Sequence, residues 1–245
     1  MLSRPAPAPE SSHRFGSDPD QVFDIYLSES DSGSRFPPVV LVHGGYWRPE
    51  YDRSHARSAA AGLAHAGWTT ALPEYRRIPG DPEASVQDVM QSIAAITEFT
   101  NASKVLLVGH SAGGHLALVA ASALGDKVAG VLALAPLSEL SLAEARNLDD
   151  GAVTSFLGAP AADRRDLDPM HLTYPQVPIV LMHGAADSVV PVDMSKNFTE
   201  KHPVSLVVLE DIGHFEPIDP QSSAWSHVLE TLASVSTRSS HSPRS

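Results

Sequence analysis

The chain has 245 residues, of which 42% are hydrophobic, and this length suits one α/β domain with a large core. Its 29 acidic residues outnumber its 17 basic ones, for a formal net charge of −12, and no basic cluster is present. This balance argues against partners made of nucleic acid and against an anionic membrane surface. The absence of cysteine excludes disulfides and thiolate metal sites.

Short apolar runs alternate with helical patterns along the chain. Residues 22–27 alternate in polarity and predict an outer, antiparallel strand, whereas 86–100 repeat apolar residues at three- and four-residue spacing and predict a helix. Strand–helix alternation predicts an α/β fold, a mostly parallel sheet with helices on both faces. The further strands are expected at 39–42, 69–72, 105–108, 128–134, 179–182 and 205–209, and the further helices at 54–66, 112–124, 192–201 and 222–234.

The two ends of the chain are polar and rich in small residues. We therefore expect disordered tails at 1–14 and 236–245, flanking a single domain at 15–235. No run approaches the roughly 18 apolar residues of a membrane helix. The start also lacks the apolar region of a secretory signal, and we expect a cytoplasmic protein.

The longest interval between predicted strands is 135–177. A structureless loop of this length is unusual in a compact domain, so we expect short helices there. They form either a small cap over the site or ordinary connections with no role in substrate choice.

The stretch Gly109-His110-Ser111-Ala112-Gly113 is the most informative motif. It has the form G-x-S-x-G, with a predicted strand before it and a predicted helix after it. A serine on such a sharp strand-to-helix turn is exposed as a nucleophile, and the two glycines allow the tight backbone path.

A serine hydroxyl needs a base, and the base needs an orienting acid. Asp187 follows the predicted strand 179–182, and His214 follows the strand 205–209. This order, Ser111 then Asp187 then His214, is that of α/β-hydrolases, and all three lie at the carboxyl ends of strands. The alternatives are a turn-forming aspartate and a surface histidine. The competing acids near the histidine are Glu210, Asp211 and Glu216.

A glycine-rich stretch, His43-Gly44-Gly45-Tyr46-Trp47, follows the early strand 39–42. Acyl transfer builds negative charge on a carbonyl oxygen, which backbone N–H groups stabilise. We assign these donors to Gly45, Tyr46 and Ala112, the residue after the nucleophile. The alternative is a plain turn with aromatic packing.

These motifs resemble a known family. The stretch 43–47 is similar to the H-G-G-x-W signature of arylformamidases (kynurenine formamidases) and related bacterial esterases. The stretch 109–116 is similar to the nucleophile segment of these enzymes, and 214–220 resembles their segment around the catalytic histidine. The similarity of order covers about residues 20–235. It implies an α/β-hydrolase fold with a small cap, hydrolysis without a cofactor, and an aryl formamide as the substrate. Gly114 departs from the alanine of some formamidases.

Other residues suggest further roles. His43, His110 and His183 lie near strand ends, but the hydrolase pattern accounts for each, and we expect no metal. Arg76 could hold an acidic substrate, although a structural ion pair is the preferred interpretation. Tyr46, Trp47 and Phe215 are the candidate substrate-binding residues, each with packing as its alternative.

The sequence therefore predicts a serine hydrolase of small-molecule esters or amides, with N-formylkynurenine-like formamides as the first substrate class. The alternatives are a carboxylesterase for short acyl esters and, in another class, a catalytically silent ligand-binding protein on the same scaffold. An acyl-peptide hydrolase ranks third among the enzymes, because the chain lacks room for the extra domain that restricts access. The physiological substrate and the oligomeric state are not predicted.

Overall fold

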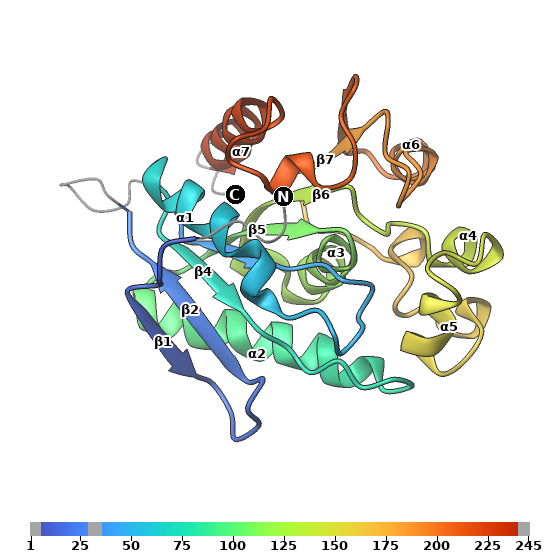
Figure 1. Cartoon of the computed structure of the whole chain (residues 1–245), viewed down its shortest axis with the longest axis horizontal. Coiled ribbons are helices and arrows are strands. Elements are labelled where there is room, and N and C mark those ends of the chain that lie inside the picture. The colour runs from blue at the N-terminus through green and yellow to red at the C-terminus, as the bar shows by residue number, and fades with distance from the viewer. Residues whose placement is uncertain (1–5, 29–35, 240–245) are drawn as a thin grey trace.

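The computed structural model describes residues 6–28 and 36–239. Eight strands form one sheet in the order β1-β2-β4-β3-β5-β6-β7-β8. The first two pairings, β1 with β2 and β2 with β4, are antiparallel, and every other pairing is parallel. The predicted α/β-hydrolase fold is therefore confirmed (Figure 1). The strands are β1 (Ser11–Arg14), β2 (Val22–Tyr26), β3 (Val39–Val42), β4 (Thr70–Pro73), β5 (Val105–His110), β6 (Val128–Leu134), β7 (Ile179–Gly184) and β8 (Ser205–Leu209).

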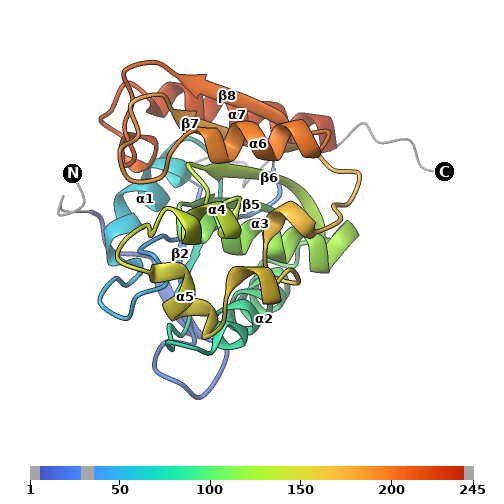
Figure 2. The ribbon, with the colours of Figure 1, turned by 90° about the vertical axis from the view of Figure 1, so that its right-hand side faces the viewer.

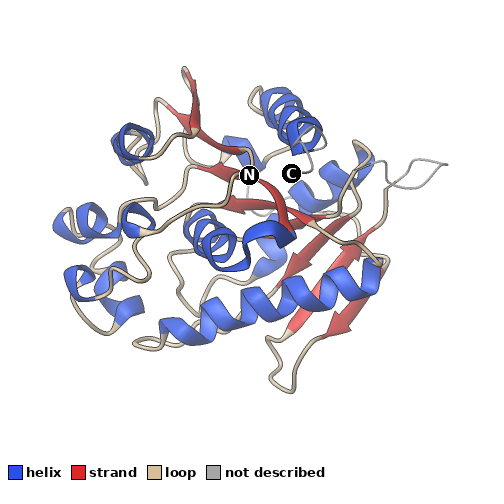
Figure 3. Cartoon of the chain, turned by 180° about the vertical axis from the view of Figure 1, so that it is seen from behind, coloured by secondary structure: helices blue, strands red, loops and turns tan. Residues whose placement is uncertain are grey.

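Helices cover both faces of this twisted sheet (Figure 3). The period-two alternation of strand side chains decides which face each residue supplies. In β3, for example, Val40 and Val42 belong to one core cluster and Val39 and Leu41 to the other. The helices α2, α3 and α6 pack on the first cluster, and α1 and α7 pack on the second. The helices are α1 (Arg57–His65), α2 (Pro82–Thr100), α3 (Ala112–Leu124), α4 (Leu140–Ala145), α5 (Ala152–Leu157), α6 (Asp193–Lys201) and α7 (Trp225–Ser239).

The interval 135–177, here called the middle segment, contains the short helices α4 and α5 and two 3₁₀ turns, as expected. Figure 2 shows α4 and α5 beside the end of the sheet, in front of α3. Asp168 holds this segment together, because its carboxylate accepts the backbone N–H groups of Leu140, Ser141 and Met170 at 3.1–3.3 Å.

Both predicted tails need correction. Ser11–Arg14 forms the edge strand β1, whose alternate residues are exposed, so no apolar alternation marks it in the sequence. It is held by pairing with β2 and by a 2.6 Å bond from the Ser12 hydroxyl to Asp24. At the other end, α7 continues to residue 239, because Leu232 and Val235 bury its apolar face in the second core cluster. Residues 1–5 and 240–245 of the expected tails lie outside the described residues.

None of the helices within residues 6–28 and 36–239 has the length and apolar character needed to cross a bilayer.

Candidate active site

Ser111 occupies the turn between β5 and α3. Its backbone angles, φ 55° and ψ −119°, lie outside the usual regions for a residue with a side chain. Such strain persists only where the surroundings enforce it. Here the start of α3 packs closely against β5 and β3: a Cβ on Gly109 would lie 2.2 Å from the Gly113 carbonyl oxygen, and a Cβ on Gly113 would lie 2.1 Å from the Val42 carbonyl oxygen. Glycine at 113 thus permits the close approach that the sequence motif predicts.

His214 and Asp187 meet across two loops that follow β8 and β7. The His214 Nδ1 atom lies 2.7 Å from Asp187 Oδ2, so this nitrogen donates and leaves Nε2 free to act as a base. The other carboxylate oxygen of Asp187 accepts the N–H groups of Val189 and Val190, both at 2.8 Å. The carboxylate bonded to His214 is therefore Asp187, rather than Glu210, Asp211 or Glu216.

Asp187 is buried, and burial alone would raise the pKa of its carboxyl. The bonds from His183 and His214 outweigh this effect and hold the pKa well below its usual range. His183 donates through Nε2 to the Val190 carbonyl at 2.8 Å, and this nitrogen lies 3.3 Å from Asp187. Asp187 is thus a fixed anion beside the His214 imidazole.

A cavity of about 400 Å³ opens above Ser111 and brings most of the predicted site together. Aromatic and apolar side chains form most of its wall. The larger cavity, of about 710 Å³, lies instead at the amino ends of β3, β5 and β6 and contains none of the predicted site residues. The 400 Å³ pocket is lined by Gly45, Tyr46, Tyr51, His55, His110, Ser111, Asp149, Val189, His214 and Phe215.

The loop after β3, residues 43–51, is here called the glycine loop. Gly45, Tyr46 and Trp47 have φ values of 111°, 50° and 55°, and this succession of positive angles bends the loop over the pocket. A Cβ on Gly44 would lie 2.9 Å from the His110 carbonyl oxygen, so the loop runs directly against the turn that carries Ser111. The loop and the turn can therefore present backbone N–H groups to one point.

Ala112 begins α3 and is buried. Its N–H belongs to the first turn, where backbone donors have no partner inside the helix. The first helical bond from this turn runs from the His115 N–H to the Ser111 carbonyl, at 3.1 Å. Of the predicted donors, Gly45 and Tyr46 line the pocket with Ser111, and Ala112 directly follows Ser111 at the start of α3.

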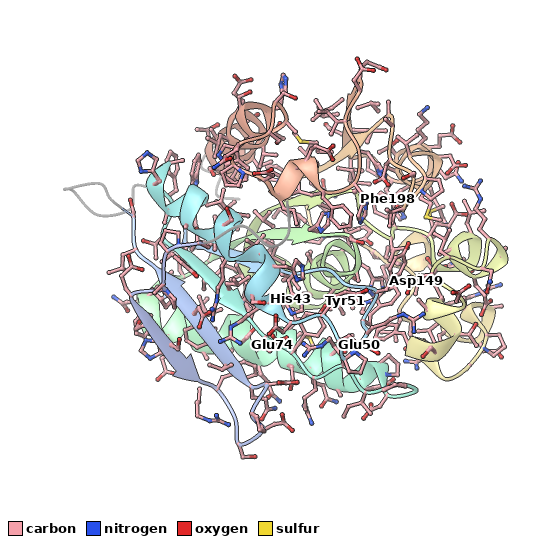
Figure 4. The ribbon with its side chains drawn as sticks, viewed as in Figure 1. His43, Glu50, Tyr51, Glu74, Asp149 and Phe198 are labelled. Carbon is pink, nitrogen blue, oxygen red and sulfur yellow. The ribbon has the colours of Figure 1, made fainter. Side chains whose placement is uncertain are left out.

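Beneath the glycine loop lies a buried group of charges. His43 bonds the Gly44 carbonyl through Nδ1 and Glu74 through Nε2, each at 2.8 Å. Glu74 also pairs with Arg77 and accepts the Arg53 N–H at 2.8 Å. Burial acts to raise the pKa of Glu74, but the neighbouring His43, Arg77 and Arg53 N–H lower it to about 2. Figure 4 shows Glu74 next to His43, near the loop that carries Tyr51.

Trp47 does not line the pocket, which corrects one of the three substrate-binding assignments. Its side chain is 3% exposed and stacks on Phe156 of α5, with ring centroids 4.4 Å apart. It therefore packs the glycine loop onto the middle segment. Tyr46 and Phe215 do line the pocket, and the Tyr46 hydroxyl donates to the Val189 carbonyl at 3.0 Å.

Arg76 forms the structural ion pair that the sequence analysis preferred, with Nε 2.7 Å from Asp88. His43, His110 and His183 do not converge. They bond Glu74, the His214 carbonyl and Ser195, respectively. The described part of the chain contains no group of side chains arranged to hold a metal ion.

Five lining residues were missed from the sequence: Tyr51, His55, His110, Val189 and Asp149. His110 lies inside the predicted nucleophile motif, and Tyr51, His55 and Val189 lie within eight residues of a predicted site residue, so neighbourhood along the chain could have found these four. Asp149 comes from the middle segment and carried no signal. Burial lowers the pKa of His55 to about 4, so its imidazole is neutral beside the pocket at pH 7.

A model of the BD-FAE family matches residues 23–202. Kynurenine formamidase of Drosophila melanogaster is 24% identical over 240 residues, which cover 88% of this chain and 78% of that protein. Esterase LipC of Mycobacterium tuberculosis is also 24% identical, over 82% of this chain and 56% of its own length. Esterase B of Lactobacillus rhamnosis superposes with a TM-score of 0.79 at 24% identity, covering 96% of this chain and 89% of that one. The expected resemblance to formamidases and esterases is confirmed, and the chain belongs to the BD-FAE family.

Proposed function

We propose that this chain, a hydrolase of the ester or amide type, is a serine hydrolase in which Ser111, His214 and Asp187 form the catalytic triad. The observation that carries the proposal is one pocket that contains both Ser111 and His214, with His214 Nδ1 2.7 Å from a buried Asp187. Because Nδ1 donates to the carboxylate, the Nε2 lone pair is directed away from Asp187 and can take the Ser111 proton.

The reaction then proceeds in two halves. Ser111 Oγ attacks the carbonyl carbon while its proton passes to His214 Nε2, and the resulting imidazolium is stabilised by the Asp187 anion. His214 returns the proton to the departing oxygen or nitrogen, which leaves an acyl group on Ser111. Water then repeats the same steps in the second half, with His214 as the base, and frees the acid. No step requires a cofactor.

The oxyanion hole is assigned to the N–H groups of Gly45, Tyr46 and Ala112. The bend of the glycine loop over Ser111 and the first turn of α3 support this assignment. Donors that are fixed before the reaction need no rearrangement as charge develops, and removing one such donor costs about 10²–10³ in kcat in other enzymes. The buried His43–Glu74 pair supports the loop from below.

The proposed substrate class is an aryl formamide such as N-formylkynurenine. Support comes from the relatives named kynurenine formamidase and from a pocket wall that includes Tyr46, Tyr51 and Phe215. The second candidate is a carboxylesterase for short acyl esters, which the relatives and structures named esterase favour. The two candidates differ in the acyl group that the enzyme accepts.

A series of esters with one aryl leaving group and formyl, acetyl or butyryl acyl groups separates these candidates. A formamidase has a narrow acyl side, so kcat/KM should fall steeply from formyl to butyryl, and N-formylkynurenine should be turned over efficiently. An optimum at butyryl, without N-formylkynurenine hydrolysis, would reject the formamidase and leave the carboxylesterase.

Labelling with a fluorophosphonate tests the serine mechanism itself. The wild-type protein should react with one equivalent at Ser111, and the Ser111→Ala variant should not react. Absence of labelling in a folded wild-type protein, together with absence of ester hydrolysis, would favour the catalytically silent binding protein.

A further inference from the structure

The pocket contains one charged side chain that the triad does not use. Asp149 lies in the connection between α4 and α5, yet it lines the same cavity as Ser111 and His214. Figure 4 shows Asp149 where the middle segment faces the glycine loop with Glu50 and Tyr51. Nothing in the proposed chemistry requires a second carboxylate here.

The backbone around Asp149 turns sharply. Asn147, Asp149 and Asp150 have φ values of 50°, 47° and 48°, in the left-handed region that, apart from glycine, asparagine and aspartate adopt most readily. The contacts of Asp149 show what holds this turn against the pocket.

Arg48 of the glycine loop supplies the constraint. Its Nε atom bonds the Asp149 carboxylate, and its Nη2 atom bonds the Asp149 backbone carbonyl. The two bonds fix both the side chain and the main chain of Asp149 against the loop that carries Gly45 and Tyr46. The carboxylate is therefore held at the pocket wall even though its side chain is 38% exposed.

The single positive charge of Arg48 does not neutralise the acidic residues near Asp149. Arg48 bonds Asp149 alone among these acids, but the charges of Glu50 and Asp150 also act on its guanidinium and, with Asp149, raise its pKa, so acidic side chains outnumber the cation here. The rest of the pocket wall near Asp149 is aromatic or apolar, with Tyr46, Tyr51 and Val189. Aromatic faces attract cations as carboxylates do, so the wall is complementary to a positive group attached to an apolar body.

We propose that Asp149 is a specificity-determining residue that binds an ammonium group on the leaving-group side of the substrate. The inference rests on the proposed function, in which the acyl group is small and the larger aryl leaving group occupies the rest of the pocket that Asp149 lines. The substrate class is thus narrowed to aryl esters or amides whose leaving group carries a cationic amine. The opposite preference, for a carboxylate, would place recognition on Arg48.

Two isosteric esters test the proposal. One is an aryl acetate with a para 2-(trimethylammonio)ethyl group, and the other has the neutral 3,3-dimethylbutyl group in its place. Cationic analogues with one or three methylenes between the ring and the ammonium group vary the distance from the reacting ester to the charge. An aryl acetate with a para 2-carboxyethyl group serves as the anionic counterpart. The kcat/KM of each is measured at low and high salt, because an exposed charge pair is screened by salt.

We expect the wild-type enzyme to prefer the cationic ester by about five- to tenfold at low salt, with a smaller preference at high salt. Asp149→Asn should lower this ratio at least threefold, and the loss of kcat/KM should fall mainly on the cationic ester. Asparagine adopts the left-handed region readily, and its amide oxygen can still accept from Arg48, so the loop should be preserved. Asp150→Asn is the matched control, because it removes the same charge from the next residue, and it should leave the ratio unchanged.

Equal use of the cationic and neutral esters at every spacer length would overturn the proposal, as would preference for the anionic ester. A ratio that falls equally in Asp149→Asn and Asp150→Asn would also overturn it, because the net charge of −12 alone would then account for the preference. Failure of the proposed function is distinguishable, since in that case none of the esters is hydrolysed faster than by Ser111→Ala.

Discussion

Two buried histidine–carboxylate pairs lie on opposite sides of the Ser111 turn, and their bonds are nearly equal in length. His214 lies 2.7 Å from Asp187, and His43 lies 2.8 Å from Glu74. Both pairs follow the carboxyl ends of strands. Bond length and position alone would assign them the same role.

The remaining partners of each pair separate the two roles. The second ring nitrogen of His43 is used by the Gly44 carbonyl, and the side chain is fully buried. His214 instead lines the pocket with Ser111, and its Nδ1 is the nitrogen bonded to Asp187, which leaves Nε2 for the proposed role as base. Glu74 carries two arginine partners besides its histidine, whereas the partners of Asp187 are histidines and backbone N–H groups. A free nitrogen makes one pair suited to catalysis, and additional ion pairs make the other a support.

The largest expected effect is a loss of catalytic rate from a change in the pocket that contains His214. Ser111→Ala should leave the fold intact and lower kcat by about 10⁴–10⁶, because only binding and the oxyanion hole remain. Steady-state rates and circular dichroism provide the measurement. A folded variant with a tenth of the wild-type rate would remove Ser111 from the mechanism.

Asp187→Asn should be next in size. The amide can donate to His214 and favour the wrong tautomer, and the corresponding change in another serine hydrolase costs about 10⁴ in kcat. The rate is compared with those of Glu210→Gln, Asp211→Asn and Glu216→Gln as controls. If one of the controls is inactive and Asp187→Asn is not, the acid is assigned wrongly.

Glu74→Gln should lower the stability of the fold strongly and the catalytic rate only slightly. It leaves the buried Arg77 and His43 without their anion, and breaking a buried pair costs about 3–5 kcal/mol of unfolding free energy. The rate of the molecules that remain folded should fall no more than about tenfold, because positioning and not proton transfer is affected. Urea unfolding and kcat, measured on the same samples, test this difference between the pairs.

Asp88→Asn is the matched control for Glu74→Gln. Asp88 is buried and paired with Arg76, but it lies away from the pocket. It should destabilise the fold without changing kcat. An equal fall in kcat for Asp88→Asn and Glu74→Gln would mean that Glu74 has no specific link to the glycine loop.

The smallest expected effect is a pH dependence of folding stability that arises from His115, a buried residue behind the glycine loop. Burial lowers the pKa of His115 to about 4, whereas the unfolded histidine titrates near 6.5. Between these values the unfolded chain binds a proton that the folded chain does not, so stability must fall as pH decreases from 6.5 to 4. The loss from His115 is on the order of 2 kcal/mol by pH 4.5.

Urea unfolding of wild type and His115→Gln at pH 7, 5.5 and 4.5 measures this contribution. Glutamine can keep the bond to the Leu167 carbonyl, which His115 makes through Nε2 at 2.8 Å. The variant should lose less stability than the wild type over this range. Parallel curves for the two proteins would show that other groups, such as His55, dominate the acid side.

The sequence predicted the fold and the candidate triad because both depend on local patterns. The G-x-S-x-G turn, the strand before Asp187 and the loop at His214 each have a signature within a few residues. The polar strand β1 had none, since its support comes from pairing with β2 and from the contact of Ser12 with Asp24.

The pocket wall was predicted less well, because it depends on where distant segments meet. Trp47 is of a residue type that often contacts substrates. Phe156 stacks on it and covers it, however, and Phe156 lies 109 residues further along the chain. Asp149 is drawn to the pocket by Arg48, a contact across 101 residues of sequence. Neither partner can be found by periodicity or by a motif.

The bond from the Tyr46 hydroxyl to the Val189 carbonyl has a consequence for how this enzyme could acquire new substrates. Tyr46 is a pocket wall, but its hydroxyl holds the loop whose N–H groups bind Asp187. Enlarging the pocket at Tyr46 would therefore disturb Asp187, the acid of the proposed triad, as well as the space for substrate. Phe215 and the half-exposed Tyr51 also line the pocket, and among the described residues neither side chain makes a hydrogen bond to the loop after β7. Selection for bulkier substrates should accordingly accept changes at 51 and 215 before changes at 46.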